Sequence, residues 1–381
     1  MNRATVGHWV VVPILLAAAA GRSATAVESH DSSKGMFPDC GTPQDISAAG
    51  IPALRNSSSP SLTRGPYLQM PSPNGIVVRW RSTTPTDSRV RYGPAPGSLG
   101  LSFDVPGQRI EHEVTLSGLD PDTRYFYSVG TTTSVLAGGD DEHVFRTAPL
   151  PGSDQPLRIW VIGDSGTANA SAAAVRDAYE SFTGDVHTNL WLMLGDNAYQ
   201  DGTDEEYQAA VFDMYPRRLR QSGLWSTLGN HDGHSASSGT QSGPYYNIFS
   251  LPTAGEVGGV PSGTEAYYSF DFGNIHFICL NSYDVDRAPG STMLTWLEHD
   301  LMNTVQDWTV AFWHHPPYSK GSHDSDSEGR MSDMRENALP ILEAGGPQKP
   351  SGRERRHLQA HSPRGKRGSC LVSCPCSCAS A

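Results

Sequence analysis

The sequence predicts two folds in succession, a small antiparallel β-sandwich followed by a layered α/β domain. Residues 63–148 consist of short alternating apolar and polar segments between Pro and Gly turns, a pattern typical of sandwich strands. Beyond a Pro- and Gly-containing linker, residues 157–345 alternate strand-like and helix-like segments, which favours a sheet layered with helices. At 381 residues the chain is long enough for both folds.

Five segments of the first domain are expected to be strands: Ile76–Arg81, Arg89–Tyr92, His112–Leu116, Tyr125–Val129 and His143–Arg146. The stretch Leu119–Tyr125 resembles the tyrosine corner of fibronectin type III domains, in which the Tyr125 hydroxyl would bond back to the backbone of the corner. Trp80 would fill the core between the sheets. The alternative is a module that binds a glycan or a protein partner. No cluster of aromatic residues indicates such a surface, so we expect a structural role beside the site.

The second domain should contain six strands and four helices. The expected strands are Leu157–Ile162, Leu190–Leu194, Leu224–Leu228, Tyr267–Asp271, Ile275–Leu280 and Trp308–Trp313, of which the fourth and fifth form a hairpin. The expected helices are Ser171–Phe182, Asp204–Arg220, Met293–Val305 and Met331–Glu343. The second of these helices begins with acidic and ends with basic residues, as the helix dipole favours. Residues 233–263 are rich in Gly, Ser and Pro and should form loops near the site.

The first 26 residues indicate a secretory signal peptide. Arg3 precedes an apolar core from Trp9 to Ala20, and Ala24–Ala26 has the small-x-small spacing of a cleavage site. The apolar core is too short to span a bilayer comfortably, although an uncleaved anchor is the alternative. We therefore expect a secreted, extracytoplasmic protein without membrane contact after cleavage. Residues 27–62 should form an irregular lead-in. Asn56 and Asn169 begin Asn-x-Ser sequences that could make the protein a glycoprotein.

The net charge argues against one class of partner. The chain carries a formal charge of −12 and has a pI of about 5.6. A general nucleic-acid binder needs a basic face for phosphate contacts, so no nucleic-acid partner is expected. An acidic surface also repels a phosphate ester, and a site for one would need its own positive charge. Bound metal ions could supply that charge.

Polar turns follow four of the strands expected in the second domain. They are Gly163–Gly166, Gly195–Tyr199, Gly229–Asp232 and His314–Tyr318. Because the carboxyl ends of strands in an α/β sheet share one edge, these turns can converge on one crevice. The alternative for Asp196 and Tyr199 is an Asp-Asn turn closing a strand, with the tyrosine packed beneath it. The recurrence of similar turns on both sides favours a shared site.

The side chains of these turns predict a metal site. They offer two carboxylates, a phenol, an amide oxygen and imidazoles, which suit a pair of iron, manganese or zinc ions better than a thiolate zinc site does. Two such ions could share Asp196 as a bridge, bind a phosphate oxygen and generate a metal-bound hydroxide near neutral or acid pH. The four tail cysteines, Cys370, Cys374, Cys376 and Cys378, match no zinc-ribbon spacing. Phosphate ester hydrolysis follows from this donor set more readily than redox chemistry.

These four motifs resemble those of the purple acid phosphatases, a branch of the calcineurin-like metallophosphoesterases. The sandwich before them is similar to the N-terminal domain of the plant-type members, so the resemblance covers roughly residues 63–345. Two features select the branch: the first motif is Asp-Ser-Gly where most metallophosphoesterases have Asp-x-His, and Tyr199 stands at the position of the phenolate ligand. The implied fold is a fibronectin type III-like domain followed by a metallophosphoesterase domain that is incomplete at its C-terminal end.

The resemblance also implies the roles of individual residues. Fe³⁺ would be held by Asp164, Asp196 and Tyr199, and a divalent Zn, Mn or Fe ion by Asp196, Asn230 and His314. The choice of His314 over His315 rests on the family pattern, in which the ligand lies two residues before a Pro. His231 would contact the phosphate or protonate the leaving alcohol. His323 would be a second substrate-facing histidine, or else a solvated residue of a polar loop.

The family closes its site with a Gly-His-x-His motif that follows one more strand, and no such motif follows His314. Residues 346–381 hold seven Lys or Arg and one Glu, are rich in Cys, and show no helix or strand pattern. Their closest histidine pair, His357 and His361, has neither a preceding Gly nor an expected strand. We interpret this tail as disordered and as the product of a shifted reading frame or an alternative exon. Loss of one imidazole from each ion would impair metal binding and activity.

The leading hypothesis is therefore an acid phosphatase that acts on small phosphate monoesters. A catalytically silent secreted binding protein is an alternative from another class, and a phosphodiesterase or nucleotide pyrophosphatase on the same site is a third possibility. The substrate, the second metal and the oligomeric state do not follow from the sequence, because the pocket walls come from loops without a readable pattern.

Overall fold

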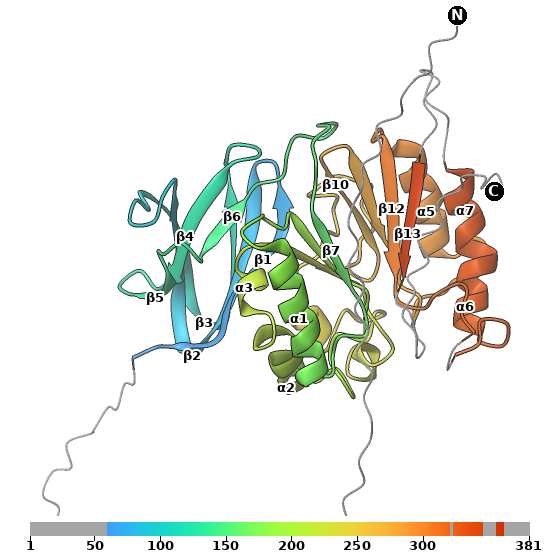
Figure 1. The fold of residues 1–381 in the computed structure, drawn as a ribbon, viewed down its shortest axis with the longest axis horizontal. Helices are drawn as coiled ribbons and strands as arrows, with labels where there is room; N and C mark the ends of the chain where they lie inside the picture. Colours follow the sequence, from blue (N-terminus) through green and yellow to red (C-terminus); the bar gives the residue numbers. More distant parts are fainter. Residues whose placement is uncertain (1–58, 321–322, 346–355, 362–381) are drawn as a thin grey trace, which may run out of the picture.

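The fold is that of a computed structural model that describes residues 59–320 and 323–345 and the backbone of residues 356–361. The predicted signal peptide 1–26 and nearly all of the predicted lead-in lie outside the described residues. Figure 1 shows a β-rich part at one end of the molecule and two groups of strands with helices at the other. In the described part of the chain, no helix is both long and apolar enough to cross a membrane.

Six strands make up the N-terminal sandwich: β1 (Leu62–Ser72), β2 (Gly75–Gly93), β3 (Leu101–Ser117), β4 (Arg124–Gly130), β5 (Val135–Gly138) and β6 (Val144–Arg146). The first two predicted strands are one long strand, because β2 continues through the polar residues 82–88 with shifts of register against β3. The prediction missed β1, in which Gly65 and Pro66 interrupt the apolar alternation, and the short strand β5.

The core of the sandwich confirms two sequence predictions. Trp80 is fully buried between the strands, and its ring stacks on His112 with centroids 4.7 Å apart. The Tyr125 hydroxyl accepts a hydrogen bond of 3.0 Å from the backbone N–H of Asp120, which is the expected tyrosine corner. This contact fixes the turn between β3 and β4.

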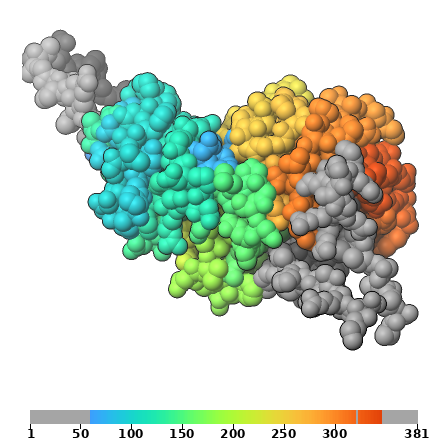
Figure 2. Space-filling model, turned by 90° about the horizontal axis from the view of Figure 1, so that it is seen from above, coloured from blue at the N-terminus to red at the C-terminus, as the bar shows by residue number. Residues whose placement is uncertain are grey.

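The first sheet of the second domain is parallel. It contains β7 (Ile159–Ile162), β8 (Leu190–Met193) and β9 (Gly223–Ser226), with α1 (Ala170–Thr183) between the first two. Strand β9 also pairs with β1, so that sandwich and α/β strands form one sheet in the order β5-β4-β2-β1-β9-β8-β7. Figure 2 shows the blue to blue-green sandwich lying directly against the green residues of this region. The two folds are therefore joined through their backbones as well as their side chains.

The single helix predicted for Asp204–Arg220 is wrong. The segment instead forms α2 (Asp204–Tyr207), the π-helical turn η1 (Gln208–Phe212) and α3 (Pro216–Leu219). Pro216 lacks a backbone N–H and so begins a new helix at the N1 position rather than continuing the old one. The break places α2 by itself beside the predicted site.

The second sheet has the order β10-β11-β12-β13. Strands β10 (Tyr268–Phe272) and β11 (Ile275–Cys279) form the predicted hairpin, and β12 (Trp308–Trp313) runs parallel to β11. Helix α5 (Thr292–Asn303) precedes β12, and α6 (Gly329–Asp333), η3 (Met334–Ala338) and α7 (Leu339–Ala344) follow it as nearly continuous helix. Pro340 is the second residue of α7 and directly follows the π-helical turn η3. The shorter η2 (Asp232–His234) and α4 (Pro244–Ile248) belong to the loops between the sheets.

The expectation that the tail contains no strand is wrong for six residues. Arg356–His361 forms β13, which pairs in parallel with β12 along its whole length. The backbone register sets His357 opposite Thr309 and His361 opposite Trp313. Sequence patterning could not show this, because a neighbouring strand supplies hydrogen bonds to any extended backbone whatever its side chains. The other tail residues lie outside the described part.

The two sheets pack face to face around one apolar core. Trp225 of β9 stacks on Phe270 of β10 with centroids 3.6 Å apart, and side chains of both sheets belong to the same buried cluster. Helix α1 covers the outer face of the first sheet, where Tyr179 stacks on Trp160. Helices α5 and α7 cover the outer face of the second sheet, as Figure 1 shows. The result is a helix-sheet-sheet-helix arrangement whose parallel strand ends carry the predicted site.

Candidate metal centre

The loops that leave β7, β8, β9 and β12 meet at one end of the two sheets. Asp164 follows β7 and Asp196 follows β8, and both adopt positive φ, of 53° and 51°. This left-handed conformation is uncommon for residues other than Gly and recurs at functional sites, although Asp tolerates it better than most. It turns the backbone sharply at the strand end. Gly195, with φ of 85°, allows close approach, since a Cβ there would lie 2.8 Å from His314 Nδ1.

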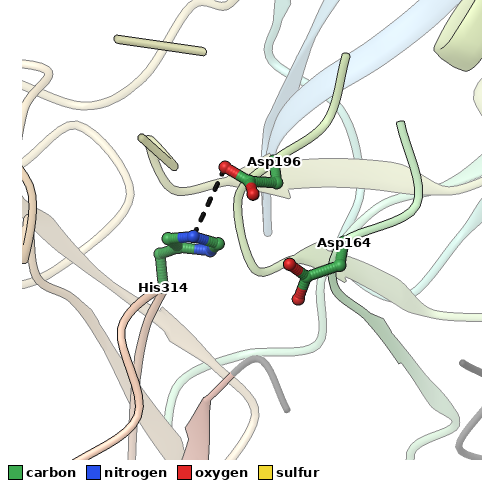
Figure 3. A group of neighbouring side chains, drawn as sticks. All are labelled: Asp164, Asp196 and His314. Carbon is green, nitrogen blue, oxygen red and sulfur yellow. Dashed lines mark ion pairs between the residues drawn. The ribbon is translucent and has the colours of Figure 1, made fainter. Parts of the chain in front are cut away.

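Three of the predicted ligands form a tight group. Asp164, Asp196 and His314 each offer one donor atom, and these atoms lie within 4.8 Å of one another (Figure 3). His314 Nε2 lies 3.3 Å from Asp196 Oδ1, while its Nδ1–H donates to the Leu194 carbonyl at 2.8 Å. That bond directs Nε2 into the group. Imidazole and carboxylate donors bind first-row metals with bonds of about 2 Å, so small side-chain shifts would bring all three around one ion.

The other two predicted ligands lie at the same place. The Tyr199 hydroxyl lies 3.1 Å from Asp164 Oδ1 and 3.1 Å from Asp196 Oδ2, and Asn230 Oδ1 lies 3.3 Å from His314 Nε2. The structure therefore brings together all five residues predicted as ligands, in a set of hard oxygens and imidazole that fits iron, manganese or zinc. Their role as ligands stays a prediction.

The two predicted catalytic histidines differ in their surroundings. His231 packs edge-on against the Tyr199 ring, donates from Nδ1 to the Gln200 carbonyl at 2.6 Å, and has its Nε2 4.0 Å from Asp196 Oδ2. His323 lies in the loop after β12, where its Nδ1 is 2.8 Å from Glu328 Oε1. His231 is thus beside the predicted ligands, whereas the pairing of His323 is with its own loop.

The adjacent residues His314 and His315 are both buried but face different partners. His315 Nδ1 lies 2.8 Å from Ser282 Oγ, and its ring stacks on Tyr283. Its carbonyl accepts a hydrogen bond from the Trp313 indole. His315 therefore belongs to the packing of the β11 and β12 ends, and only His314 reaches the carboxylates.

Sequence reasoning assigned no role to Asp232, which holds the ligand loops together. Its fully buried carboxylate accepts hydrogen bonds from the backbone N–H of Gly229 at 2.8 Å and of Asn197 at 3.1 Å, and from the Tyr207 hydroxyl. Burial raises its pKa to about 7, as does the nearby charge of Asp196, while these donors oppose the rise. The position of Asp232 two residues after Asn230 was the available signal, but only the fold shows that Tyr207 and Asn197 reach it.

Two protein families match the chain. Calcineurin-like phosphoesterase matches residues 157–346, and the purple acid phosphatase N-terminal domain matches residues 64–147. Among solved structures, one described as the structure of PhoD superposes with a TM-score of 0.56 at 16% identity, covering 76% of this chain and 70% of that chain. At that identity the likeness shows the fold alone.

Similar curated proteins include three from plants. Purple acid phosphatase 23 of Arabidopsis thaliana is 30% identical, with 60% of this chain and 53% of that protein covered. Purple acid phosphatase 15 of the same plant is 28% identical, with 60% and 46% covered. Purple acid phosphatase 1 of Ipomoea batatas is 24% identical, with 84% and 69% covered. The chain spans about half the length of the first two.

Proposed function

Because the chain belongs to the purple acid phosphatases of the calcineurin-like phosphoesterases, we propose that it hydrolyses small phosphate monoesters at acid pH with a dinuclear metal centre. The observation that supports this most is the convergence of Asp164, Asp196 and His314 within 4.8 Å at the strand ends. Tyr199 and Asn230 extend the group on either side. A predicted signal peptide at residues 1–26 supports a secreted enzyme.

The residues divide into two groups of donors. Asp164, Asp196 and Tyr199 would hold Fe³⁺, and Asp196, Asn230 and His314 would hold a divalent Zn, Mn or Fe ion. When bound, the ions would act as Lewis acids on the phosphate and on the attacking water. The chain prepares this arrangement, since the backbone N–H of His231 donates to Asp196 Oδ1 at 3.0 Å and orients that carboxylate.

The chain's own residues would then handle the substrate. His231 is held by its Nδ1–H bond to Gln200, which leaves Nε2 to contact a phosphate oxygen or to give a proton to the leaving alcohol. Its side chain is 24% exposed, so a substrate entering from solvent can meet it. His323, oriented by Glu328, would be a second contact to the phosphate ester.

We also propose that metal binding is weaker than a complete ligand set would give. The sequence after His314 has no Gly-His-x-His, and each ion would lack one imidazole. Because even residues that only support a ligand are worth roughly ten- to a hundredfold in metal affinity, a missing ligand should cost more. Excess metal in the assay should then raise activity.

The test measures metal content, visible absorption and turnover of p-nitrophenyl phosphate in the purified full chain. A phosphatase should contain iron, hydrolyse the substrate at acid pH, and show a visible band from Tyr199 phenolate on Fe³⁺. Tyr199→Phe should remove that band, whereas Tyr92→Phe in the sandwich should keep it. If the purified protein contained no metal and showed no turnover even after excess metal was added, the silent binding protein would be the remaining hypothesis. Preference for bis-p-nitrophenyl phosphate would indicate a phosphodiesterase.

A further inference from the structure

Helix α2 is only four residues long, yet it contacts the sandwich, the Tyr199 loop and the base of the metal centre. Three of its four residues have side chains in these contacts: Asp204, Glu206 and Tyr207. Each contact is a hydrogen bond or an ion pair, so each one fixes direction as well as distance. The helix therefore connects two parts of the molecule that sequence analysis treated as separate.

On the sandwich side, Asp204 is held by two arginines. Arg64 of β1 donates to Asp204 Oδ1 at 3.0 Å, and Arg81 of β2 donates to the same oxygen at 2.6 Å and also bonds Oδ2. The Arg64 side chain is fully buried and lies over the Phe212 ring, 4.1 Å from its centroid. Hydrogen bonds from Arg81 lower the pKa of Asp204, so the carboxylate stays ionised in acid. Two arginines of the sandwich thus bind the first residue of α2.

On the site side, Glu206 holds the turn that follows Tyr199. Its carboxylate accepts from the backbone N–H groups of Gln200 at 2.5 Å, Asp201 at 3.0 Å and Thr203 at 2.9 Å. Although partial burial opposes it, these N–H bonds lower the pKa of Glu206. One of these N–H groups, that of Asp201, belongs to the Gln200–Asp201 peptide, and the carbonyl of this same peptide accepts a hydrogen bond from His231 Nδ1. The position of Glu206 therefore sets the orientation of His231.

The last residue of α2 reaches beneath the centre. The Tyr207 hydroxyl is buried and donates to Asp232, which in turn holds the backbone N–H groups of Asn197 and Gly229. Those two residues flank the predicted ligands Asp196 and Asn230. A shift of α2 would thus disturb both ligand loops as well as His231.

The geometry points to Asp204 as a positioning residue: through Arg64 and Arg81 the sandwich holds α2 where Glu206 and Tyr207 orient His231 and the ligand loops. This inference deepens the proposed phosphatase function, and its catalytic consequence rests on that function. It assigns the sandwich a part in the reaction, whereas a domain that only flanks the site would add stability and nothing else. The two roles differ in what breaking the ion pair does to residues 200–203.

Asp204→Asn tests the inference, with Asp104→Asn as its matched control. Asp104 makes a comparable two-point ion pair with Arg89, with both distances 2.6 Å, and is 41% exposed against 34% for Asp204. That pair lies wholly within the sandwich, between β2 and β3. Both variants make the same chemical change, and only Asp204 belongs to α2. Arg81→Gln, which keeps the buried Arg64 paired with Asp204, serves if Asp204→Asn does not fold.

The decisive measurement is amide hydrogen exchange of residues 200–203 in the full chain. Asp204→Asn should speed this exchange roughly tenfold, because the N–H groups bonded to Glu206 lose their fixed acceptor, while Asp104→Asn should not change it. With metal content equal to wild type, kcat should fall by up to roughly a hundredfold with little change in KM. Equal exchange in the two variants would overturn the inference while leaving the phosphatase proposal intact. A wild-type chain without metal or turnover would overturn that proposal, and the exchange comparison would still decide the role of Asp204.

Discussion

The two sheets of the second domain contribute unequally to the candidate centre. The first sheet supplies Asp164, Asp196, Tyr199 and Asn230 from three consecutive loops. Asp232 and Tyr207 of α2 join the loops after β8 and β9, and backbone N–H groups of the loop after β7 donate to carbonyls of the loop after β8. The second sheet supplies His314, whose direction is set by the Leu194 carbonyl of the first sheet. The oxygen donors are therefore preorganised within one sheet, whereas the imidazole depends on how the two sheets pack.

This difference predicts that changes in the first sheet have the larger effect. Asp196→Asn should remove both ions, because this carboxylate is the proposed ligand of each, and should lower activity by more than roughly a hundredfold. Metal analysis and p-nitrophenyl phosphate turnover provide the measurement. The control is Asp185→Asn in the exposed turn after α1. If Asp196→Asn kept its full metal content, the proposed bridging role would be wrong.

His314→Ala should cause a more selective loss in the second sheet. It removes the imidazole that faces the carboxylates and should release the divalent ion while the iron and its visible band remain. His315→Ala is the matched control, since that neighbour is equally buried but bonds Ser282. We expect His315→Ala to keep both metals and to lose about 1–3 kcal/mol of unfolding free energy through the unpaired serine. The reverse pattern would show that the ligand is His315.

The buried histidine of the second sheet should make that sheet sensitive to alkali. His276 lies between Asp271 and Asp300, with both distances 2.7 Å, and although burial opposes it, the hydrogen bonds that its ring donates to these carboxylates raise its pKa to about 9. A folded pKa above the ordinary value of 6.5 means that the stabilisation is complete below pH 6.5 and is lost as pH rises through about 9. The unfolding free energy should fall by up to about 3 kcal/mol across this range. His276→Gln should make the unfolding free energy less dependent on pH in this range. An unchanged pH dependence would show that His276 is not its cause.

The buried histidine of the sandwich should act in the opposite direction. His112 on β3 lies between Ser82 and Ser88, each 2.8 Å away, and burial lowers its pKa to about 4. The folded state then keeps the ring neutral where the unfolded chain takes up a proton, so stability falls as pH drops from 6.5 to about 4. Unfolding curves of wild type and His112→Gln in this range measure the effect. If the unfolding free energies of the two proteins changed with pH in the same way, a contribution of His112 would be excluded.

Much of the second domain could be predicted because its apolar segments have the length of buried strands and end in polar turns. Trp308–Trp313 forms β12 with the predicted bounds, and Leu190–Leu194 contains β8. The predicted helix over Asp204–Arg220 failed because helical periodicity continues across Pro216, whereas the backbone does not. Strand β13 was missed because its side chains follow no strand pattern and only its neighbour β12 reveals the pairing.

The candidate ligands were also readable, since carboxylate, phenol, amide and imidazole groups after successive strands are an unusual combination. The supporting residues were not. Apart from its position two residues after Asn230, nothing in the local sequence distinguishes Asp232 from a turn residue, and nothing distinguishes Glu206 from a surface residue in the first turn of a helix. Their partners lie on other loops, and the hydrogen bonds that define their roles exist only after the sheets have packed.

The sequence by itself determined which side chains stand at the strand ends, and hence the metal chemistry proposed for the candidate centre, because strand periodicity and turn composition are local properties. The tertiary structure decided the rest. It joined the sandwich to the first sheet through β1 and β9, separated His314 from His315, and placed α2 between Arg64 and Asp232. These outcomes depend on contacts between residues far apart in the chain, and such contacts are set by the packing of whole sheets rather than by any segment alone.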